Sequence, residues 1–115
     1  MTKTKLHVLF VCGRNKWRSP TAERIYQDDE RIEARSAGMS VKSGHTISRN
    51  DIACAHLILV MESKYKSRIL KLFYDESLPK IESLDILDEY DYMDEELISI
   101  LEKKVEYYIQ DSKIE

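Results

Sequence analysis

The sequence predicts an α/β fold, with a four-stranded parallel sheet at the centre of three layers and helices on both of its faces. Short apolar runs alternate with segments of helical period, a pattern typical of parallel strands joined by helices. The 115 residues suffice for one hydrophobic core but not for two. Hydrophobic residues make up 43% and charged residues 34%, with only three Gly and two Pro, which excludes collagen-like and disordered chains. We therefore expect a single domain over residues 1–115.

The charge balance and the cysteines exclude several classes of protein. Eighteen Lys and Arg against 21 Asp and Glu give a net charge of −3 and a pI near 5.7, which argues against a protein that coats nucleic acid or an acidic membrane. The apolar run near the N-terminus is too short for a signal peptide or a membrane span. Cys12 and Cys54 stand outside any CxxC spacing. We expect a cytoplasmic protein with reduced thiols and no nucleic-acid or membrane partner, and we leave its oligomeric state open.

The first predicted unit is a strand, a tight loop and a helix. Residues 6–11 (LHVLFV) are rich in β-branched and aromatic side chains, which predicts a central strand. The strand stops at a loop in which Gly13 and Asn15 permit positive φ. Ser19 then predicts a helix N-cap and Pro20 the first helical position, so that a helix should run to about residue 28.

Three further strands are expected, at residues 32–37, 57–61 and 81–86. In the first of these, apolar side chains alternate with Glu33 and Arg35, and the strand ends at a glycine. This alternation favours a position at the edge of the sheet. Residues 57–61 (LILVM) are apolar throughout, which is typical of a strand buried on both faces.

Three further helices complete the pattern. Ser48 and Asp51 have the spacing of a capping box, which begins a short helix to about residue 55. Ser63 is expected to cap a second helix, and the acidic residues 94–96 favour the start of the last one. The second helix has apolar positions at Tyr65, Ile69, Leu72 and Phe73, and its other face carries Lys64, Lys66, Arg68 and Lys71. We expect this basic face to be solvated and to have no further role.

The loop after the first strand carries the most informative motif. Cys12 and Arg18 are separated by five residues between the end of a strand and the start of a helix. In an open α/β sheet, the crevice beyond the carboxyl ends of the strands is the usual ligand site, and a helix N-terminus there presents N–H groups to an anion. The amides of residues 13–18 would surround a phosphate, and Arg18 would add a bidentate guanidinium. This spacing therefore predicts a site for a tetrahedral oxyanion.

The positive electrostatic field of the loop amides and Arg18 would favour the thiolate form of Cys12 and so produce a nucleophile. Ser19 is placed to donate a hydrogen bond to the sulfur, and Asn15 to brace the loop. The alternatives are a structural cysteine at a strand end and a serine that only caps the helix. Cys54, between two alanines, favours a packing role. No GxxxxGK[ST] motif of nucleotide hydrolases is present.

Several other loop residues have both a functional and a structural interpretation. Arg14 and Lys16 either steer an anionic substrate or are solvated, and Trp17 belongs either to the core or to the wall of a pocket. Tyr90 and Tyr92 either line the entrance or pack against the fold. The histidines, His7, His45 and His56, match no metal-ligand spacing, so we expect no metal site.

Phosphate transfer to a cysteine also requires a proton donor for the leaving oxygen. Asp88 follows the fourth predicted strand and, in a parallel sheet, emerges at the same edge as Cys12. Asp91 and Asp94 compete for this role, whereas Asp85 is expected within the strand.

The motifs together resemble the low molecular weight protein tyrosine phosphatase family. Residues 8–12 (VLFVC), Asn15, Arg18-Ser19-Pro20 and Ala22-Glu23 match its opening motif, and Ser36-Ala37-Gly38 and residues 57–62 match later ones. Trp17 and the stretch Tyr92-Met93-Asp94 are similar to a compact subgroup of about this length. The resemblance implies the strand order 2-1-3-4 and hydrolysis of a phosphate monoester without metal or other cofactor. It also assigns roles: nucleophile for Cys12, phosphate clamp for Arg18, hydrogen-bond donor for Ser19, loop bracing for Asn15 and Ser36, and general acid for Asp88.

The chain departs from the family pattern at three positions. Arg14 stands where the family has a glycine, and Glu89 where it has a proline after the acid. Trp17 replaces a second cysteine that protects the first by forming a disulfide, which implies that this protection is absent.

The leading hypothesis is therefore a phosphatase that acts on a phosphorylated protein, above all on phosphotyrosine, or on a small phosphomonoester. One alternative is a module that binds phosphate or a phosphoprotein without turnover. The other is an arsenate reductase, which would need a relay of cysteines although only Cys54 is available.

Overall fold

The structure is a computed structural model that describes residues 5–14 and 16–111. Strands and helices alternate through this part of the chain, as the sequence predicts. The elements are β1 (Leu6–Cys12), α1 (Arg18–Tyr26), β2 (Ile32–Gly38), α2 (Arg49–Cys54), β3 (Leu57–Val60), α3 (Ser63–Leu72), β4 (Lys80–Ser83) and α4 (Glu95–Asp111).

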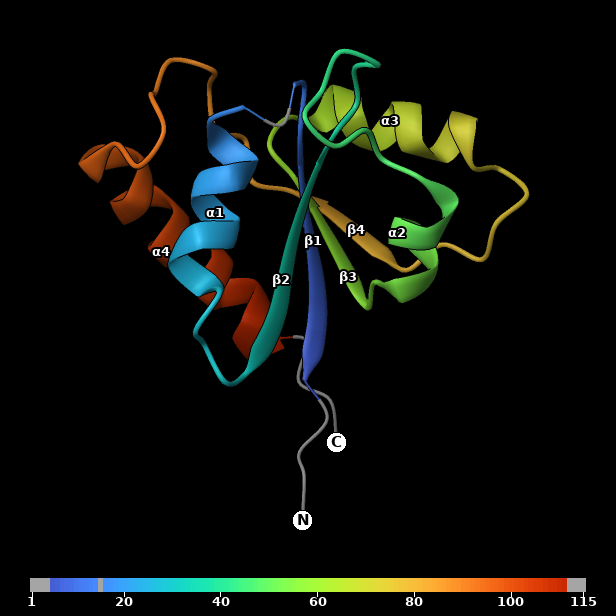
Figure 1. Ribbon diagram of the computed structural model, residues 1–115. Coiled ribbons are helices and arrows are strands. Elements are labelled where there is room, and N and C mark those ends of the chain that lie inside the picture. The colour runs from blue at the N-terminus through green and yellow to red at the C-terminus, as the bar shows by residue number, and fades with distance from the viewer. Residues whose placement is uncertain (1–4, 15, 112–115) are drawn as a thin grey trace.

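The four strands form one parallel sheet in the order β2-β1-β3-β4. Helices α1 and α4 cover one face of this sheet, and α2 and α3 cover the other (Figure 1). The predicted α/β class, the strand order 2-1-3-4 and the edge position of β2 are confirmed.

The core lies on both sides of the two central strands. The side chains of residues 8–11 in β1 and 57–60 in β3 are at most 1% exposed, as expected for apolar strands between two helical layers. On α4, Leu97, Leu101 and Val105 are fully buried at helical spacing. No helix in the described part of the chain combines the length and the apolar character that crossing a bilayer requires.

The first helix begins earlier than predicted. α1 starts at Arg18 with Trp17 in the N-cap position, so that Ser19 and Pro20 lie inside its first turn. Pro20 is tolerated there because the first amides of a helix have no intrahelical acceptor. The predicted capping role of Ser19 is wrong, and its hydroxyl contacts Cys12 instead. By contrast, the capping box of Ser48 and Asp51 is confirmed at the start of α2.

β4 is displaced relative to the predicted strand 81–86. It begins at Lys80 and ends at Ser83, because Asp85 adopts a left-handed conformation with φ 53°. Asp85 is thus exposed beyond the strand rather than within it. Beyond Asp85, the chain again pairs with the backbone that follows β3, since the Ile86 amide donates to the Met61 carbonyl at 2.8 Å. This pairing brings Asp88 to the same edge of the sheet as the end of β1.

α3 also differs in detail from its prediction. Ser63 is its first residue rather than its cap, and Glu62 occupies the N-cap position. Leu72 was expected in the core but is 55% exposed, whereas Tyr65, Ile69 and Phe73 are buried.

Candidate active site

Cys12 lies at the carboxyl end of β1, directly below the first turn of α1. Its Sγ is 2.9 Å from Ser19 Oγ, and both side chains are buried. Ser19 Oγ is also 3.4 Å from the Ala37 carbonyl oxygen of β2. A hydroxyl both donates and accepts, so it is able to donate to a thiolate, or to accept from a thiol while it donates to Ala37. Ser19 is therefore placed to donate a hydrogen bond to a Cys12 thiolate.

Arg18 is buried, at 3% exposed, and has carboxylates on two sides. Its Nη1 donates to Glu62 Oε2 at 2.8 Å and to the Ile86 carbonyl at 2.7 Å, and its Nε lies 3.6 Å from Asp88 Oδ1. Burial alone would lower the pKa of Arg18, but the hydrogen bond to Glu62 and the charge of Asp88 outweigh it and raise this pKa above its ordinary value. The guanidinium is therefore held in place and remains charged.

Glu62 follows β3 by two residues, which places it at the same edge of the sheet. Burial alone would raise the pKa of Glu62, but the hydrogen bond and charge of Arg18 hold it below its usual range. The carboxylate thus stays ionised and serves as the fixed partner of the guanidinium.

Tyr65 of α3 extends this network towards the loop. Its hydroxyl donates to Glu62 Oε2 at 3.2 Å, and burial raises the pKa of Tyr65. A Cβ on Gly13 would lie only 2.8 Å from Tyr65 Oη. A side chain at position 13 would therefore require the Tyr65 hydroxyl to move. Gly13 does not use the positive φ that a glycine permits, since no glycine among the described residues has a positive φ.

The segment after β2 supports the loop after Cys12. The Met39 amide donates to the Cys12 carbonyl at 3.0 Å, and the Ser40 amide donates to the Gly13 carbonyl at 2.8 Å. The Gly13 carbonyl also accepts from Ser43 Oγ at 3.3 Å. With these carbonyls bonded to the neighbouring segment, the loop is anchored by residues 39, 40 and 43.

A cavity of about 500 Å³ opens at this edge of the sheet. Cys12 and Arg18 both line it, and Asp88 faces it from the loop after β4. The described residues around it are Cys12, Gly13, Arg14, Lys16, Trp17, Arg18, Met39, Ser40, Lys64, Tyr65, Arg68 and Asp88. The half-buried Trp17 is thus part of the pocket wall, which answers the question that the sequence left open.

Of the three aspartates considered as proton donors, Asp88 is the one that lines the cavity. Its side chain is 60% exposed and lies beside Arg18. Asp94 instead accepts from the Glu96 amide at 2.8 Å and thus caps the start of α4. Asp91 is exposed, and Tyr90 packs against the core without lining the cavity.

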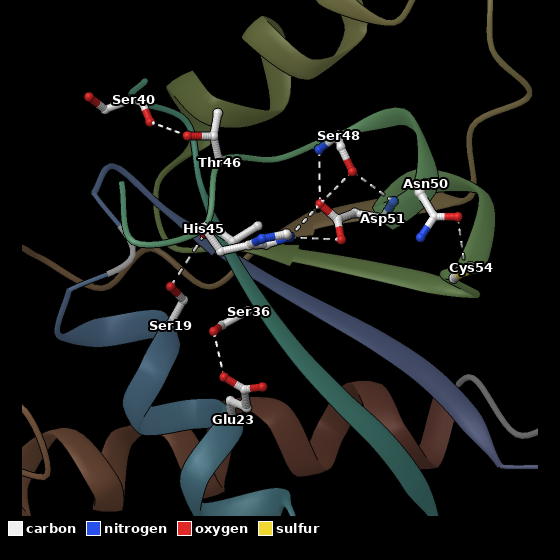
Figure 2. A network of polar contacts seen from close by, with 11 residues as sticks. Ser19, Glu23, Ser36, Ser40, His45, Thr46, Ser48, Asn50, Asp51 and Cys54 are labelled. Carbon is white, nitrogen blue, oxygen red and sulfur yellow. Dashed lines mark hydrogen bonds and ion pairs between the residues drawn. The ribbon is translucent and has the colours of Figure 1, made fainter. Parts of the chain in front are cut away.

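Ser36 and the histidines lie outside the cavity. Ser36 Oγ donates to Glu23 Oε1 of α1 at 2.6 Å (Figure 2), so Ser36 joins β2 to α1. Asn15, its expected partner in bracing the loop, is outside the described residues. His45 Nε2 lies 2.9 Å from Asp51 Oδ2 at the start of α2 (Figure 2). Among the described residues, no three His, Cys, Asp or Glu side chains gather in a way that would hold a metal ion.

Thr21 connects the two segments that carry Arg18 and Asp88. Its hydroxyl donates to the Trp17 carbonyl at 2.6 Å and accepts from the Met93 amide at 2.9 Å. Thr21 is fully buried, and Met93 has a left-handed backbone with φ 62°. The hydroxyl therefore fixes the far end of the loop that begins near Asp88 to the start of α1.

Six residues of the site were not predicted to belong to it. Met39 and Ser40, after β2, line the cavity. Glu62 and Tyr65 hold Arg18, and Lys64 and Arg68 line the cavity, although the basic face of this helix was expected to be merely solvated. One signal was present in the sequence. Residues 64, 65 and 68 share one face of a helix that directly follows a central strand, and the start of such a helix lies at the carboxyl edge of the sheet.

Several solved structures share this fold. The low molecular weight protein tyrosine phosphatase SP-PTP of Streptococcus pyogenes is 17% identical with a TM-score of 0.77, and the comparison covers 96% of this chain and 95% of that one. YwlE arginine phosphatase of Geobacillus stearothermophilus is 22% identical with a TM-score of 0.70 and 92% of each chain covered. The tyrosine phosphatase Wzb of Escherichia coli, in complex with sulphate, is 18% identical with a TM-score of 0.68, with 94% of this chain and 99% of that one covered.

Sequence comparison gives a more specific result. A search of curated protein sequences finds no significant match to this chain. The family model described as low molecular weight phosphotyrosine protein phosphatase matches residues 7–69, which is more than half of the chain and includes the loop from Cys12 to Arg18. This chain therefore belongs to the low molecular weight phosphotyrosine protein phosphatase family.

Proposed function

We propose that this phosphatase hydrolyses phosphotyrosine in proteins through a phosphocysteine intermediate on Cys12. One observation carries the proposal. The Cys12 sulfur, 2.9 Å from the Ser19 hydroxyl, lies at a cavity that the Arg18 guanidinium and the Asp88 carboxyl also line. Nucleophile, anion clamp and proton donor are thus at one site.

In the first step, the Cys12 thiolate attacks phosphorus and the bond from phosphorus to the tyrosine oxygen breaks. Arg18 and the amides of the loop hold the oxygens of the transferring phosphoryl group, on which negative charge is spread. Asp88 gives a proton to the leaving phenolate oxygen. The products of this step are a free tyrosine side chain and phosphocysteine.

In the second step, water attacks phosphocysteine. Asp88, now a carboxylate, takes a proton from the water as its oxygen bonds to phosphorus, and the bond from phosphorus to sulfur breaks. Inorganic phosphate leaves, and the thiolate is regenerated beside Ser19. Each step uses side chains of the cavity, and neither needs a metal ion.

The cavity wall favours phosphotyrosine over phosphoarginine, although an arginine phosphatase shares the fold. Trp17 and Tyr65 supply aromatic surface beside the phosphate site. Arg14, Lys16, Lys64 and Arg68 place positive charge around it, and a phosphorylated guanidinium that carries positive charge would be repelled. A small phosphomonoester with an aromatic leaving group would bind in the same way.

The geometry gives less support to arsenate reduction. Cys54 is a free, half-buried thiol on α2, 4.0 Å from Asn50 Oδ1 (Figure 2). Cys54 lies before the amino end of β3, where Leu57 pairs with Val8. Cys12 lies at the carboxyl end of β1, at the opposite end of the parallel strands. A disulfide between the two sulfurs would require a large rearrangement. We also propose the cytoplasmic location expected from the sequence, because a reducing compartment keeps a nucleophilic thiol available.

The test is hydrolysis of para-nitrophenyl phosphate in a chelating buffer without added metal. We expect turnover by the wild type, inhibition by vanadate and complete loss in Cys12→Ser. In Asp88→Asn we expect a fall of about 10²–10⁴ with phenyl phosphate, whose leaving group needs a proton, and a smaller fall with para-nitrophenyl phosphate. Asp91→Asn is the matched control, and its rate should remain near that of the wild type.

Two results would contradict the proposal. Phosphate binding to the wild type without turnover would favour the binding module that the sequence left open. Arsenate-dependent oxidation of thiols that is lost in Cys54→Ser would favour a reductase.

A further inference from the structure

We propose that Arg14, Lys16, Lys64 and Arg68 form a basic rim that selects phosphoproteins with acidic residues beside the phosphotyrosine. This inference rests on the proposed function and specifies the substrate class of the same site. All four side chains line the cavity that contains Cys12.

The rim comes from two separate segments of the chain. Arg14 and Lys16 belong to the loop between β1 and α1. Lys64 and Arg68 lie four residues apart on α3, one turn above the other, on the face that also presents Tyr65 to the cavity. A substrate whose phosphate reaches Cys12 therefore passes between cations contributed by a loop and by a helix.

Three of the four rim charges have no acidic partner among the described residues, and the fourth has a distant one. In the part of the chain that the structure describes, no ion pair joins Arg14, Lys16 or Arg68 to an acidic side chain. Lys64 lies 3.7 Å from Glu62 Oε1, but its side chain is 67% exposed. The Lys16 ammonium is 4.7 Å from the centre of the Trp17 ring, which places this charge over the pocket wall.

The concentration of positive charge contrasts with the protein as a whole, whose net charge is −3. Asp88 is the one acidic side chain among the described residues that line the cavity, and it already faces Arg18. Arg18 is buried at the phosphate site, whereas the rim cations are exposed. Arg18 therefore serves the phosphate, and the rim is free to attract a second set of negative charges on the same substrate.

The test compares two phosphotyrosine peptides that differ only in their flanking residues, Asp and Glu in one and Asn and Gln in the other. We expect kcat/KM of the wild type to be about tenfold higher for the acidic peptide at low salt, and the ratio to fall towards one as ionic strength rises. Arg68→Glu should lower this ratio about fivefold or more, because it replaces an attraction by a repulsion. Lys71→Glu makes the same kind of change on α3 away from the cavity and should leave the ratio unchanged.

A ratio near one in the wild type, or an equal fall in Arg68→Glu and Lys71→Glu, would overturn the inference. Para-nitrophenyl phosphate has no flanking residues, so its turnover reports on the proposed chemistry alone. Binding of both peptides to Cys12→Ser, measured by fluorescence anisotropy, tests the rim without catalysis. Tighter binding of the acidic peptide there, reduced by Arg68→Glu, would support the rim even if the wild type hydrolysed neither peptide.

Discussion

Arg18 and Arg31 each pair with two carboxylates, yet their surroundings differ. Arg18 is 3% exposed between Glu62 and Asp88, at the cavity. Arg31 is 45% exposed, and it pairs with Asp29 in the turn before β2 and with Glu106 of α4. The hydrogen bonds that Arg31 donates to Asp29 and Glu106 raise the pKa of Arg31.

The comparison shows that an arginine between carboxylates does not by itself indicate a site. The Arg31 cluster joins the turn before β2, an edge strand, to α4. Because the cluster is exposed to solvent, its ion pairs contribute little to stability. The buried Arg18 is held by a half-buried carboxylate and a backbone carbonyl, and it faces a cavity that Cys12 also lines. Burial and a shared cavity, rather than charge, distinguish Arg18, the proposed phosphate-binding group, from the structural Arg31.

The largest difference between the clusters is expected in turnover. Arg18→Lys keeps the positive charge but loses the planar fork, so kcat/KM for para-nitrophenyl phosphate should fall about 10²–10³-fold. Arg31→Lys makes the same exchange in the other cluster and should leave kcat/KM within twofold of the wild type, because Arg31 is outside the cavity. Similar losses in both variants, with both proteins folded by circular dichroism, would remove the distinction.

A smaller effect is expected where Thr21 joins the Arg18 side of the cavity to the loop after Asp88. Thr21→Val removes the hydroxyl that bridges the Trp17 carbonyl and the Met93 amide while keeping the shape of the side chain. A misplaced Asp88 matters most when the leaving group needs a proton. We expect the rate to fall about tenfold with phenyl phosphate and much less with para-nitrophenyl phosphate, a general-acid effect that a uniform loss of folded protein would not give.

Thr21→Ser is the control for this experiment, because it retains the hydroxyl. It should restore most of the phenyl phosphate rate. Equal losses for the two substrates would show that Thr21 supports the fold without positioning the acid.

The smallest effect is expected in the stability of the Arg31 cluster. Hydrogen bonds donated by Arg31 lower the pKa of Asp29. Hydrogen bonds donated by Arg31 and Gln110 lower the pKa of Glu106. Carboxyls with a lowered folded-state pKa stabilise the protein above their unfolded pKa, near 4, and this contribution is lost as the pH falls through the folded-state pKa. Because the cluster is exposed, Glu106→Gln should cost only about 0.5 kcal/mol at pH 7.

Urea unfolding of the wild type and Glu106→Gln at pH 7 and pH 3 measures this contribution. The difference in unfolding free energy should disappear at the lower pH. A difference that persists at pH 3 would show that Glu106 acts through packing instead of charge.

The sequence was informative where local pattern and topology decide the structure. The apolar runs of β1 and β3 predict central strands, because a strand between two helical layers must be apolar on both faces. Cys12 and Arg18 could be placed at one site because a short loop joins them at the carboxyl end of a strand. Asp88 could be placed there as well, because all strands of a parallel sheet end at the same edge.

The parts that were missed depend on tertiary packing. Tyr65 has the spacing of a core residue and is buried, but only the packing of α3 against the loop shows that its hydroxyl reaches Glu62. Arg68 has the sequence pattern of a solvated helix face, and only the packing of α3 shows that it lines the cavity. Ser19 has the sequence of a cap, and only the position of Cys12 beneath it shows where its hydroxyl points.

The most direct test of this account is to trap the enzyme during turnover of para-nitrophenyl phosphate by rapid quenching and to map the phosphorylated residue by mass spectrometry. We expect phosphate on Cys12, an increased amount of it in Asp88→Asn if that variant slows hydrolysis of the intermediate more than its formation, and none in Cys12→Ser. Steady turnover in Cys12→Ser, or phosphate found on Cys54 instead, would contradict the assignment of Cys12 as the nucleophile.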